Sequence, residues 1–242
     1  MMRSRTAVLL FAAVLGLTPA MAHASSLSVS PVSIQVAAPG ATSSLTLENS
    51  GTDAITSQIR VYKWTQENGQ DVLTPTKEVV ASPPFLKLPA GAKNVVRVVR
   101  MVKSLVPQED AYRLVVDELP KNATESSVGV GISLRYSLPV FFTGVAASPP
   151  ALAWSASVSG GQIILKAENT GGRHMRLANL HIDSGGKTIT LSSGLAGYVL
   201  QGSDKVWTIK NTAKFSPGTT VSVSAEGDNG PIKATAKLAA AK

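Results

Sequence analysis

Apolar and polar residues alternate along almost the whole of this chain, and this feature limits its fold more than any other. Segments rich in Val, Ile, Leu, Thr and Ser follow one another, separated by Gly, Pro and Asn. A period of two residues is typical of strands that bury one face, whereas no stretch shows the period of a long helix. We therefore predict an all-β protein.

The first half of the chain has the number of strands expected of an immunoglobulin-like sandwich, which is about seven. Turns such as Asn68-Gly69 and Pro83-Pro84 supply the backbone torsions at which a chain reverses. The predicted strands are Leu27–Ser30, Ile34–Ala37, Ser43–Glu48, Ile55–Trp64, Asn94–Met101, Ala111–Glu118 and Val128–Phe142.

The composition changes between Gly144 and Pro150, where small residues and prolines interrupt the alternation. Such a segment is typical of a linker. The alternation resumes in strands predicted at 162–167, 177–182, 188–191, 205–209, 219–225 and 232–238. We predict two immunoglobulin-like β-sandwich domains, at residues 25–145 and 146–242. Asn169-Thr170-Gly171 repeats the pattern of Asn49-Ser50-Gly51, which predicts the same strand and turn in both halves.

Residues 1–24 have the features of a signal peptide. Arg3 and Arg5 precede the apolar run Ala7–Leu17, and Ala22-His23-Ala24 provides a small-residue cleavage site. The apolar run is short for a helix that spans a bilayer. We predict export and cleavage after Ala24, which removes two arginines from a chain of formal charge +8.

Residues suited to catalysis or metal binding are sparse. The chain has no cysteine, which excludes thiol chemistry and cysteine-ligated zinc. His174 and His181 remain after signal cleavage, without a carboxylate at ligand spacing, and no serine occupies a Gly-x-Ser-x-Gly turn. We predict a protein with no catalytic residue, metal or cofactor, and place both histidines on the surface or on strands.

Two pairs of acidic residues, Glu109-Asp110 and Asp117-Glu118, are the nearest approach to paired catalytic carboxylates. Neighbouring residues on a strand point to opposite faces of the sheet, so the two members of a pair do not converge on one substrate. We therefore interpret both pairs as surface charges near the ends of strands.

The longest alternating run is the predicted strand Val128–Phe142. Its apolar residues Val128, Val130, Ile132, Leu134, Tyr136, Leu138 and Val140 share one face. The run is longer than the usual strand of about five or six residues. This length predicts that some of its apolar side chains extend beyond an ordinary core and are available to bind a partner. The alternative is an ordinary last strand of a sandwich, with this face in the core.

Four motifs are specific in combination: Leu45-Thr-Leu-Glu-Asn-Ser-Gly51, Ser82-Pro-Pro-Phe85, Tyr112-Arg-Leu-Val-Val-Asp-Glu-Leu-Pro120 and Ser137-Leu-Pro-Val-Phe141. Together they resemble the PapD-like periplasmic chaperones of the chaperone-usher pilus pathway. Their residues are similar to those of the archaic branch of that family. The resemblance covers most of the chain after residue 24. It implies two immunoglobulin-like domains arranged in an L, and a periplasmic location.

The resemblance also implies a mechanism. A pilus or fimbrial subunit that lacks its last strand takes a chaperone strand into its groove, and the complex is delivered to an outer-membrane usher. The donor residues implied here are Val128, Val130, Ile132, Leu134 and Tyr136. Such an exposed apolar edge needs a cover when no subunit is bound, and self-association of the free protein is one way to provide it.

The family holds the subunit's C-terminal carboxylate with two basic residues in the cleft between the domains. Many relatives carry an arginine where this chain has Ser33, so the resemblance leaves Arg113 and Arg135 as the anchor candidates. A planar guanidinium suits this role because it donates two parallel hydrogen bonds to a carboxylate. The alternative is that either arginine is a surface residue neutralised by Asp117 or Glu118.

Two other functions fit parts of the pattern: a secreted immunoglobulin-like adhesin or pilus subunit, and a carbohydrate-binding surface protein built on Trp64 or Trp207. A donor-strand subunit carries its extension at the N-terminus, whereas here the long strand lies mid-chain. A sugar binder needs clustered aromatic residues, and these make up only 5% of the chain. Lys and Arg are scattered singly, which argues against a nucleic-acid partner. The prediction is therefore a pilus-assembly chaperone.

Overall fold

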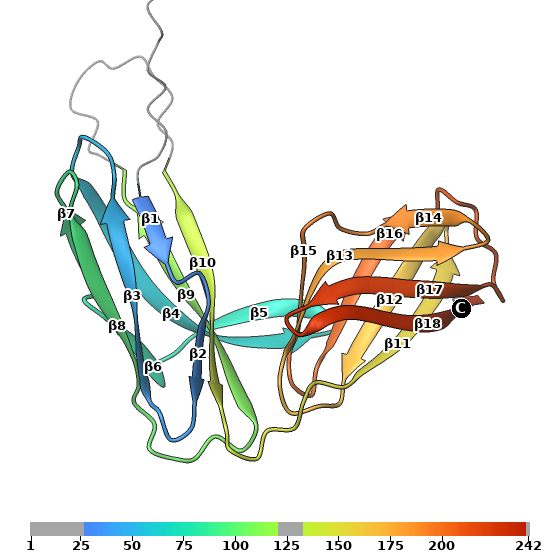
Figure 1. The fold of residues 1–242 in the computed structure, drawn as a ribbon, viewed down its shortest axis with the longest axis horizontal. Coiled ribbons are helices and arrows are strands. Elements are labelled where there is room, and N and C mark those ends of the chain that lie inside the picture. Colours follow the sequence, from blue (N-terminus) through green and yellow to red (C-terminus); the bar gives the residue numbers. More distant parts are fainter. Residues whose placement is uncertain (1–26, 121–132, 241–242) are drawn as a thin grey trace, which may run out of the picture.

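The computed structural model describes residues 27–120 and 133–240, and the predicted signal peptide lies outside them. All regular elements of the described residues are strands, grouped in two lobes that form an L (Figure 1). Within these residues no helix is long and apolar enough to cross a membrane. The all-β prediction is thus confirmed.

The first lobe is a sandwich of two sheets. One sheet has the order β1 (Leu27–Ser30), β3 (Thr42–Asn49), β8 (Lys93–Arg100) and β6 (Val79–Ser82). The other has the order β2 (Ile34–Ala37), β10 (Arg135–Thr143), β9 (Glu109–Glu118), β4 (Ile55–Glu67) and β5 (Gln70–Pro75), with β7 (Phe85–Leu88) also paired to β4.

Alternating apolar residues of both sheets fill the space between them. Leu47 and Val96 from one sheet and Leu114 and Val140 from the other are fully buried. Alternate residues of β9 and β10 point away from this core, and it is this outer face that the second lobe approaches.

The second lobe begins with β11 (Leu152–Ser159). Its strands follow the order β14 (Lys187–Thr190), β13 (Met175–Ser184), β17 (Thr220–Gly227), β18 (Gly230–Ala240), β11, β12 (Gln162–Asn169) and β16 (Asp204–Lys210), and β15 (Leu195–Val199) pairs with β13. A separate core lies between these strands and includes Leu165, Leu180 and Val223.

The repeated Asn-x-Gly pattern forms the same structure in both lobes, as predicted. Asn49 ends β3 and Asn169 ends β12, and both side chains are almost completely buried. Each side-chain oxygen accepts a hydrogen bond from the amide of the glycine two residues later, at 3.0 Å. Each side-chain amide donates to backbone carbonyls of neighbouring segments, among them Leu88 and Val199 at 3.1 Å. One buried amide therefore ties a strand end to its surroundings in each sandwich.

A hairpin of the first lobe reaches the second. Strands β4 and β5 extend beyond the first sandwich toward the second lobe (Figure 1). The Gln66 side chain donates to the carbonyl of Tyr198 at 2.7 Å and accepts from the amide of Leu200 at 2.9 Å. At the hairpin tip, the Val206 amide donates to the Gly69 carbonyl at 3.3 Å. The hairpin is thus a second connection between the lobes, besides the chain itself.

Substitution of Gly69 tests this connection. Gly69 has φ +76°, and a Cβ there would lie 2.4 Å from Cγ2 of Val206. We expect Gly69→Ala to displace the hairpin from β16, with a larger radius of gyration in small-angle X-ray scattering and a loss of about 2 kcal/mol of stability. Gly186→Ala is the matched control, because Gly186 has φ +74° and nothing within 4 Å of the same position. Equal behaviour of the two variants would contradict the proposed contact.

Five strands were not predicted, namely β5, β6, β7, β11 and β15. β5 is exposed along nearly its whole length, so burial imposes no period of two on its sequence. β6 and β7 each bury only one residue fully, Val79 and Leu88, so neither shows an alternating pattern of burial. These strands are held by their neighbours rather than by their own apolar pattern.

Candidate functional site

An aromatic cluster joins the two lobes at the bend of the L, and we call it the elbow. Its members are Trp64, Ala111 and Phe141 from the first lobe and Tyr198 and Leu200 from the second. The rings of Trp64 and Tyr198 meet edge to face, with centroids 5.4 Å apart. All five residues are buried, so the elbow fixes the outer face of β4, β9 and β10 against the second lobe.

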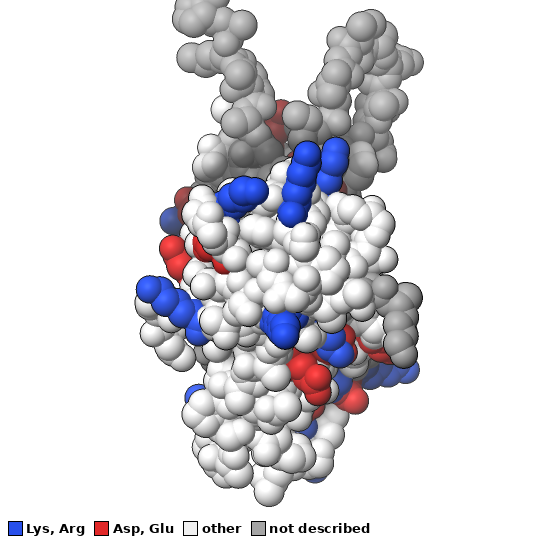
Figure 2. Space-filling model, turned by 90° about the vertical axis from the view of Figure 1, so that its right-hand side faces the viewer, with Lys and Arg blue, Asp and Glu red and all other residues white. Residues whose placement is uncertain are grey.

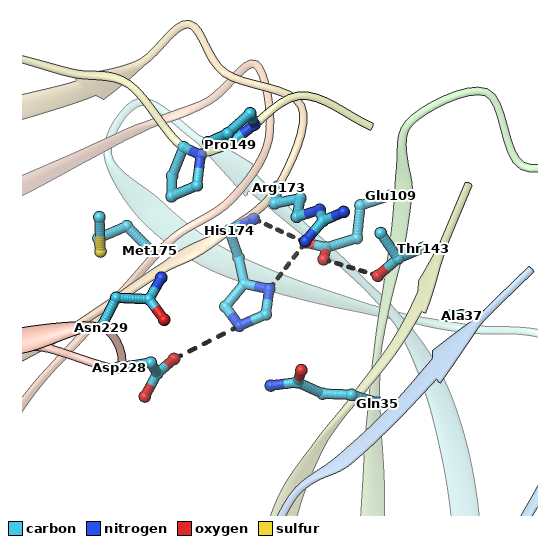
Figure 3. Close-up of a pocket in the computed structure, with 11 residues that line it drawn as sticks. Gln35, Ala37, Glu109, Thr143, Pro149, Arg173, His174, Met175, Asp228 and Asn229 are labelled. Carbon is cyan, nitrogen blue, oxygen red and sulfur yellow. Dashed lines mark hydrogen bonds and ion pairs between the residues drawn. The ribbon is translucent and has the colours of Figure 1, made fainter. Parts of the chain in front are cut away.

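A buried polar contact between Glu109 and His174 lies next to the elbow. The backbone amide of His174 donates to Oε1 of Glu109 at 2.7 Å, and its Nδ1 lies 2.8 Å from the same oxygen. The His174 ring stacks on Phe141 with centroids 3.5 Å apart. Figure 3 shows Glu109 and His174 lining a pocket between the lobes, with Thr143 donating to the second oxygen of Glu109.

The interpretation of Glu109 as a surface charge is therefore wrong. Its side chain is only 2% exposed, because the second lobe covers the end of β9. His174 is likewise buried between the lobes, whereas His181 lies on β13 and is partly exposed. Among the described residues, no group of three His, Cys, Asp or Glu side chains is placed to hold a metal ion.

Arg113 lies on the outer face of β9, one step along the strand from the elbow. Its guanidinium stacks 3.7 Å above the Trp64 ring and lies 5.4 Å from the Tyr198 ring centre. Burial lowers its pKa, but an arginine stays charged in a protein. Within residues 27–120 and 133–240 it forms no ion pair with a carboxylate. The cleft thus contains a partly buried cation that lies over aromatic rings, donates from Nη1 to the Ser137 carbonyl at 3.4 Å and has no ion pair, although the Asp71 carboxylate nearby favours its charged form.

Arg135 has a different environment, farther from the elbow. Its Nε donates to Asp117, which also accepts from Arg60 on β4. Burial alone would raise the pKa of Asp117, but the hydrogen bonds from Arg135 and Arg60 hold it below its ordinary value. The Asp117 side chain is 11% exposed, so it is not the surface charge that was predicted. Asp117 neutralises Arg135, as the sequence-based alternative allowed, and leaves Arg113 alone.

Strand β10 has a free edge next to these arginines. From Arg135 to Thr143 it pairs with β9, but β2 covers its other side only at Val140–Thr143. Residues 135–139 therefore have a strand neighbour on one side alone among the described strands. An edge of this kind presents unpaired backbone groups to any chain that approaches it.

The predicted strand Val128–Phe142 differs from the described one. β10 begins at Arg135, although Glu118 still donates its amide to the carbonyl of Leu134 at 2.8 Å. Leu138 and Val140 face the core as predicted, but the opposite face is also buried at Pro139 and Phe141 because it meets the second lobe. The predicted donor residues Val128, Val130 and Ile132 lie outside the described residues.

Comparison with known proteins agrees with this arrangement. The profile of the pili and flagellar-assembly chaperones, PapD N-terminal domain, matches residues 26–145. A solved structure from Acinetobacter baumannii, the complex of chaperone CsuC with tip adhesion subunit CsuE from archaic chaperone-usher Csu pili, matches 89% of this chain and 99% of its own. That match has 27% identity and a TM-score of 0.67. The chain belongs to the PapD-like family of pilus-assembly chaperones.

Two further structures share the fold of this PapD-like chaperone. The YadV chaperone is 17% identical with a TM-score of 0.64, and the match covers 88% of this chain and all of that one. The complex of the Salmonella enterica SafA pilin with the SafB chaperone gives 19% identity, a TM-score of 0.62 and coverage of 88% and 97%. No curated protein sequence matches the chain. The predicted family, two-domain fold and non-enzymatic class are confirmed.

The remaining predicted donor residues of this PapD-like chaperone are half-buried. Leu134 lies immediately before β10, and Tyr136 packs against the first core and donates its hydroxyl to the carbonyl of Leu27. Ser33, which stands where many relatives carry an arginine, lies immediately before β2. Among these positions only Arg113 brings an unneutralised charge into the cleft.

The surface of the PapD-like chaperone offers little to a sugar or a nucleic acid. Trp64 is buried in the elbow, while Trp207 stacks on Trp154 and donates its Nε1 to the carbonyl of Ala196 at 2.9 Å. On the face in Figure 2, Lys and Arg stand in separate groups with uncharged surface between them. No continuous basic stripe crosses that face.

Sequence reasoning missed several residues of the site. The elbow partners Phe141 and Tyr198 and the buried pair Glu109 and His174 come from different lobes, and their spacing in the sequence carries no signal of the contact. The pairing of Arg60 with Asp117 had a detectable signal, because charges on adjacent predicted strands tend to pair. This signal identifies the pair only once β4 is known to lie beside β9.

Proposed function

We propose that this protein is a periplasmic chaperone that binds pilus subunits by donating the edge of β10 and then delivers them to an outer-membrane usher. The single observation that carries the proposal is the free edge at residues 135–139, which lies beside an unneutralised arginine in the cleft. Backbone groups along that edge supply affinity that tolerates different subunit sequences, and the cation supplies a fixed point of register.

The related structures support the subunit as the partner. The archaic Csu complex pairs a chaperone with a tip adhesion subunit, and the Saf complex pairs a chaperone with a pilin. We assign the donor strand to Val128, Val130, Ile132, Leu134 and Tyr136, which alternate along one face in the sequence. In this assignment the apolar side chains enter the subunit's groove while the backbone pairs with its strands.

We assign the subunit's C-terminal carboxylate to Arg113. The guanidinium is partly desolvated and its Cζ lies 3.7 Å from the centre of the Trp64 ring, so less conformational entropy is lost on binding than for a fully exposed arginine. Arg135 is also close to the edge, but its charge is balanced by Asp117. We therefore give Arg135 a contact beside the donor strand rather than the chain end itself.

Periplasmic co-expression with the pilus subunits encoded beside the gene tests the function. We expect a stable one-to-one complex, and we expect Leu134→Asp to lower its yield about tenfold or more, because a carboxylate replaces an apolar anchor at the interface. Val95→Asp is the control: Val95 is 52% exposed on β8, in the other sheet, and its replacement is expected to leave the yield unchanged. A complex that survives Leu134→Asp would refute strand donation at this position.

A further inference from the structure

Arg113 and a second arginine, one from each domain, converge on Tyr198. Arg113 of β9 lies 5.4 Å from the Tyr198 ring centre. Arg176 of β13 is directly opposite Tyr198 in the antiparallel pair β13–β15, so their side chains share a face. That face meets the first domain, because Tyr198 belongs to the elbow. Burial raises the pKa of the Tyr198 hydroxyl, and the charges of Arg113 and Arg176 both oppose the rise.

Neither arginine is strongly neutralised. Arg113 forms no ion pair among the described residues, and the one carboxylate that acts on its charge, Asp71, is itself paired with Lys205 at 3.1 Å. Nη1 of Arg176 is 3.6 Å from Oδ1 of Asp228, and both side chains of this pair are more than a third exposed. An exposed ion pair of this length contributes little to stability and yields readily to a better partner. Two cations beside one tyrosine, whose counter-charges Asp71 and Asp228 are shared with Lys205 or weakly held, form a site for an anion.

We infer that Arg176 is the second cation of the carboxylate anchor, so that the subunit's chain end is held between the two domains. The inference rests on the proposed function and adds a residue from the second domain to it. Ser33 carries no charge and Arg135 is occupied by Asp117, so of the three anchor positions considered in the first domain Arg113 alone has no ion pair. Each oxygen of a carboxylate can accept hydrogen bonds from a guanidinium, so one arginine from each domain can bind the same carboxylate.

A shared anchor gives the angle of the L a role in binding. Arg176 reaches the cleft only while the elbow and the β4–β5 hairpin hold β13 and β15 beside the first domain. Gln66 is part of this support, because its side chain donates to the carbonyl of Tyr198 and accepts from the amide of Leu200. The elbow thereby positions Arg176, and loss of the angle weakens carboxylate binding even when both domains remain folded.

A double-mutant cycle between protein and ligand tests the inference. The probe is a synthetic peptide with the last 15 or so residues of a co-expressed subunit, made with a free C-terminal carboxylate or as the carboxamide. We expect Arg176→Ala in the full chain to weaken binding of the carboxylate peptide by about tenfold and of the carboxamide by less than about twofold. Arg176→Lys is expected to recover part of the loss, because it restores the charge without the planar fork.

Arg97→Ala is the control, since Arg97 is an exposed arginine on β8, in the sheet of the first domain that does not form the elbow. It is expected to bind both peptides as the wild type does. Equal weakening of the carboxylate and the carboxamide by Arg176→Ala, or no weakening of either, would overturn the shared anchor while subunit capture by the wild type stands. Failure of the wild-type chain to form any subunit complex would instead overturn the proposed function, and the inference with it.

Discussion

Replacement of Asn49 with alanine is expected to lower the free energy of unfolding by about 3 to 4 kcal/mol, because Asn49 is a buried polar residue with several hydrogen bonds. The Asn49 side chain is completely buried and donates to the carbonyls of Asp53, Leu88 and Pro89 at 2.7, 3.1 and 3.0 Å. Its oxygen accepts from the Gly51 amide at 3.0 Å. Alanine leaves these backbone groups without that partner, and the desolvation cost of each is then uncompensated.

Urea unfolding of the full chain, followed by tryptophan fluorescence and circular dichroism, measures this loss. Asn49→Asp is expected to be at least as destabilising at neutral pH, because a carboxylate cannot donate to the carbonyls and buries a charge among them. Asn94→Ala is the control, since Asn94 is exposed on β8 opposite Leu47, and a change within about 0.5 kcal/mol is expected. If Asn49→Ala unfolds at the same urea concentration as Asn94→Ala, the buried amide is not a major support of the first domain.

The repeat of this motif shows which features of the fold could be predicted from the sequence. The Asn-x-Gly pattern appears after alternating segments in both halves, and Asn49 and Asn169 form corresponding networks. Alternation also located β1, β2, β3, β4 and β9 within a few residues of their bounds. Such features are local, because the residues that determine them are adjacent in the chain or lie two apart.

The parts that sequence reasoning missed depend on contacts between distant segments. Glu109 was interpreted as a surface charge near the end of a strand, but its side chain is covered by His174, far along the chain in the second domain. Asp117 was misinterpreted for the same reason, since Arg60 approaches it from β4. An alternating pattern shows that one face of a strand is buried, but it does not show that a second domain covers the other face.

Contacts between distant segments also distinguish the two anchor candidates. The resemblance to the chaperone family left both Arg113 and Arg135 as anchor candidates. The structure separates them by their partners, with Arg135 bonded to Asp117 and Arg113 stacked on Trp64. Asp117 already balances the charge of Arg135, whereas Arg113 has no ion pair among the described residues and donates only one long bond, from Nη1 to the Ser137 carbonyl at 3.4 Å. The two positions are therefore expected to differ strongly when they are mutated.

Arg113→Glu is expected to reduce subunit capture roughly a thousandfold, which corresponds to about 4 kcal/mol. The substitution removes the charge-assisted bonds to the subunit's terminal carboxylate and places a second carboxylate in the same partly buried position, where repulsion is poorly screened. The measurement is the affinity of the purified full chain for a co-expressed subunit, obtained from exchange of the subunit onto labelled wild-type chaperone. Arg135→Glu is expected to have a smaller effect, about tenfold, because it acts beside the donor strand rather than at the chain end.

Two further variants separate the charge of Arg113 from its packing. Arg113→Gln keeps a long side chain over Trp64 without the charge, so a folded protein with the full loss of capture would assign the effect to the missing cation. Arg113→Lys keeps the charge but loses the planar fork and the stacking, and is expected to retain part of the affinity. Subunit capture by Arg113→Glu at the wild-type level, in a protein with an unchanged unfolding midpoint, would show that the carboxylate is held elsewhere in the cleft.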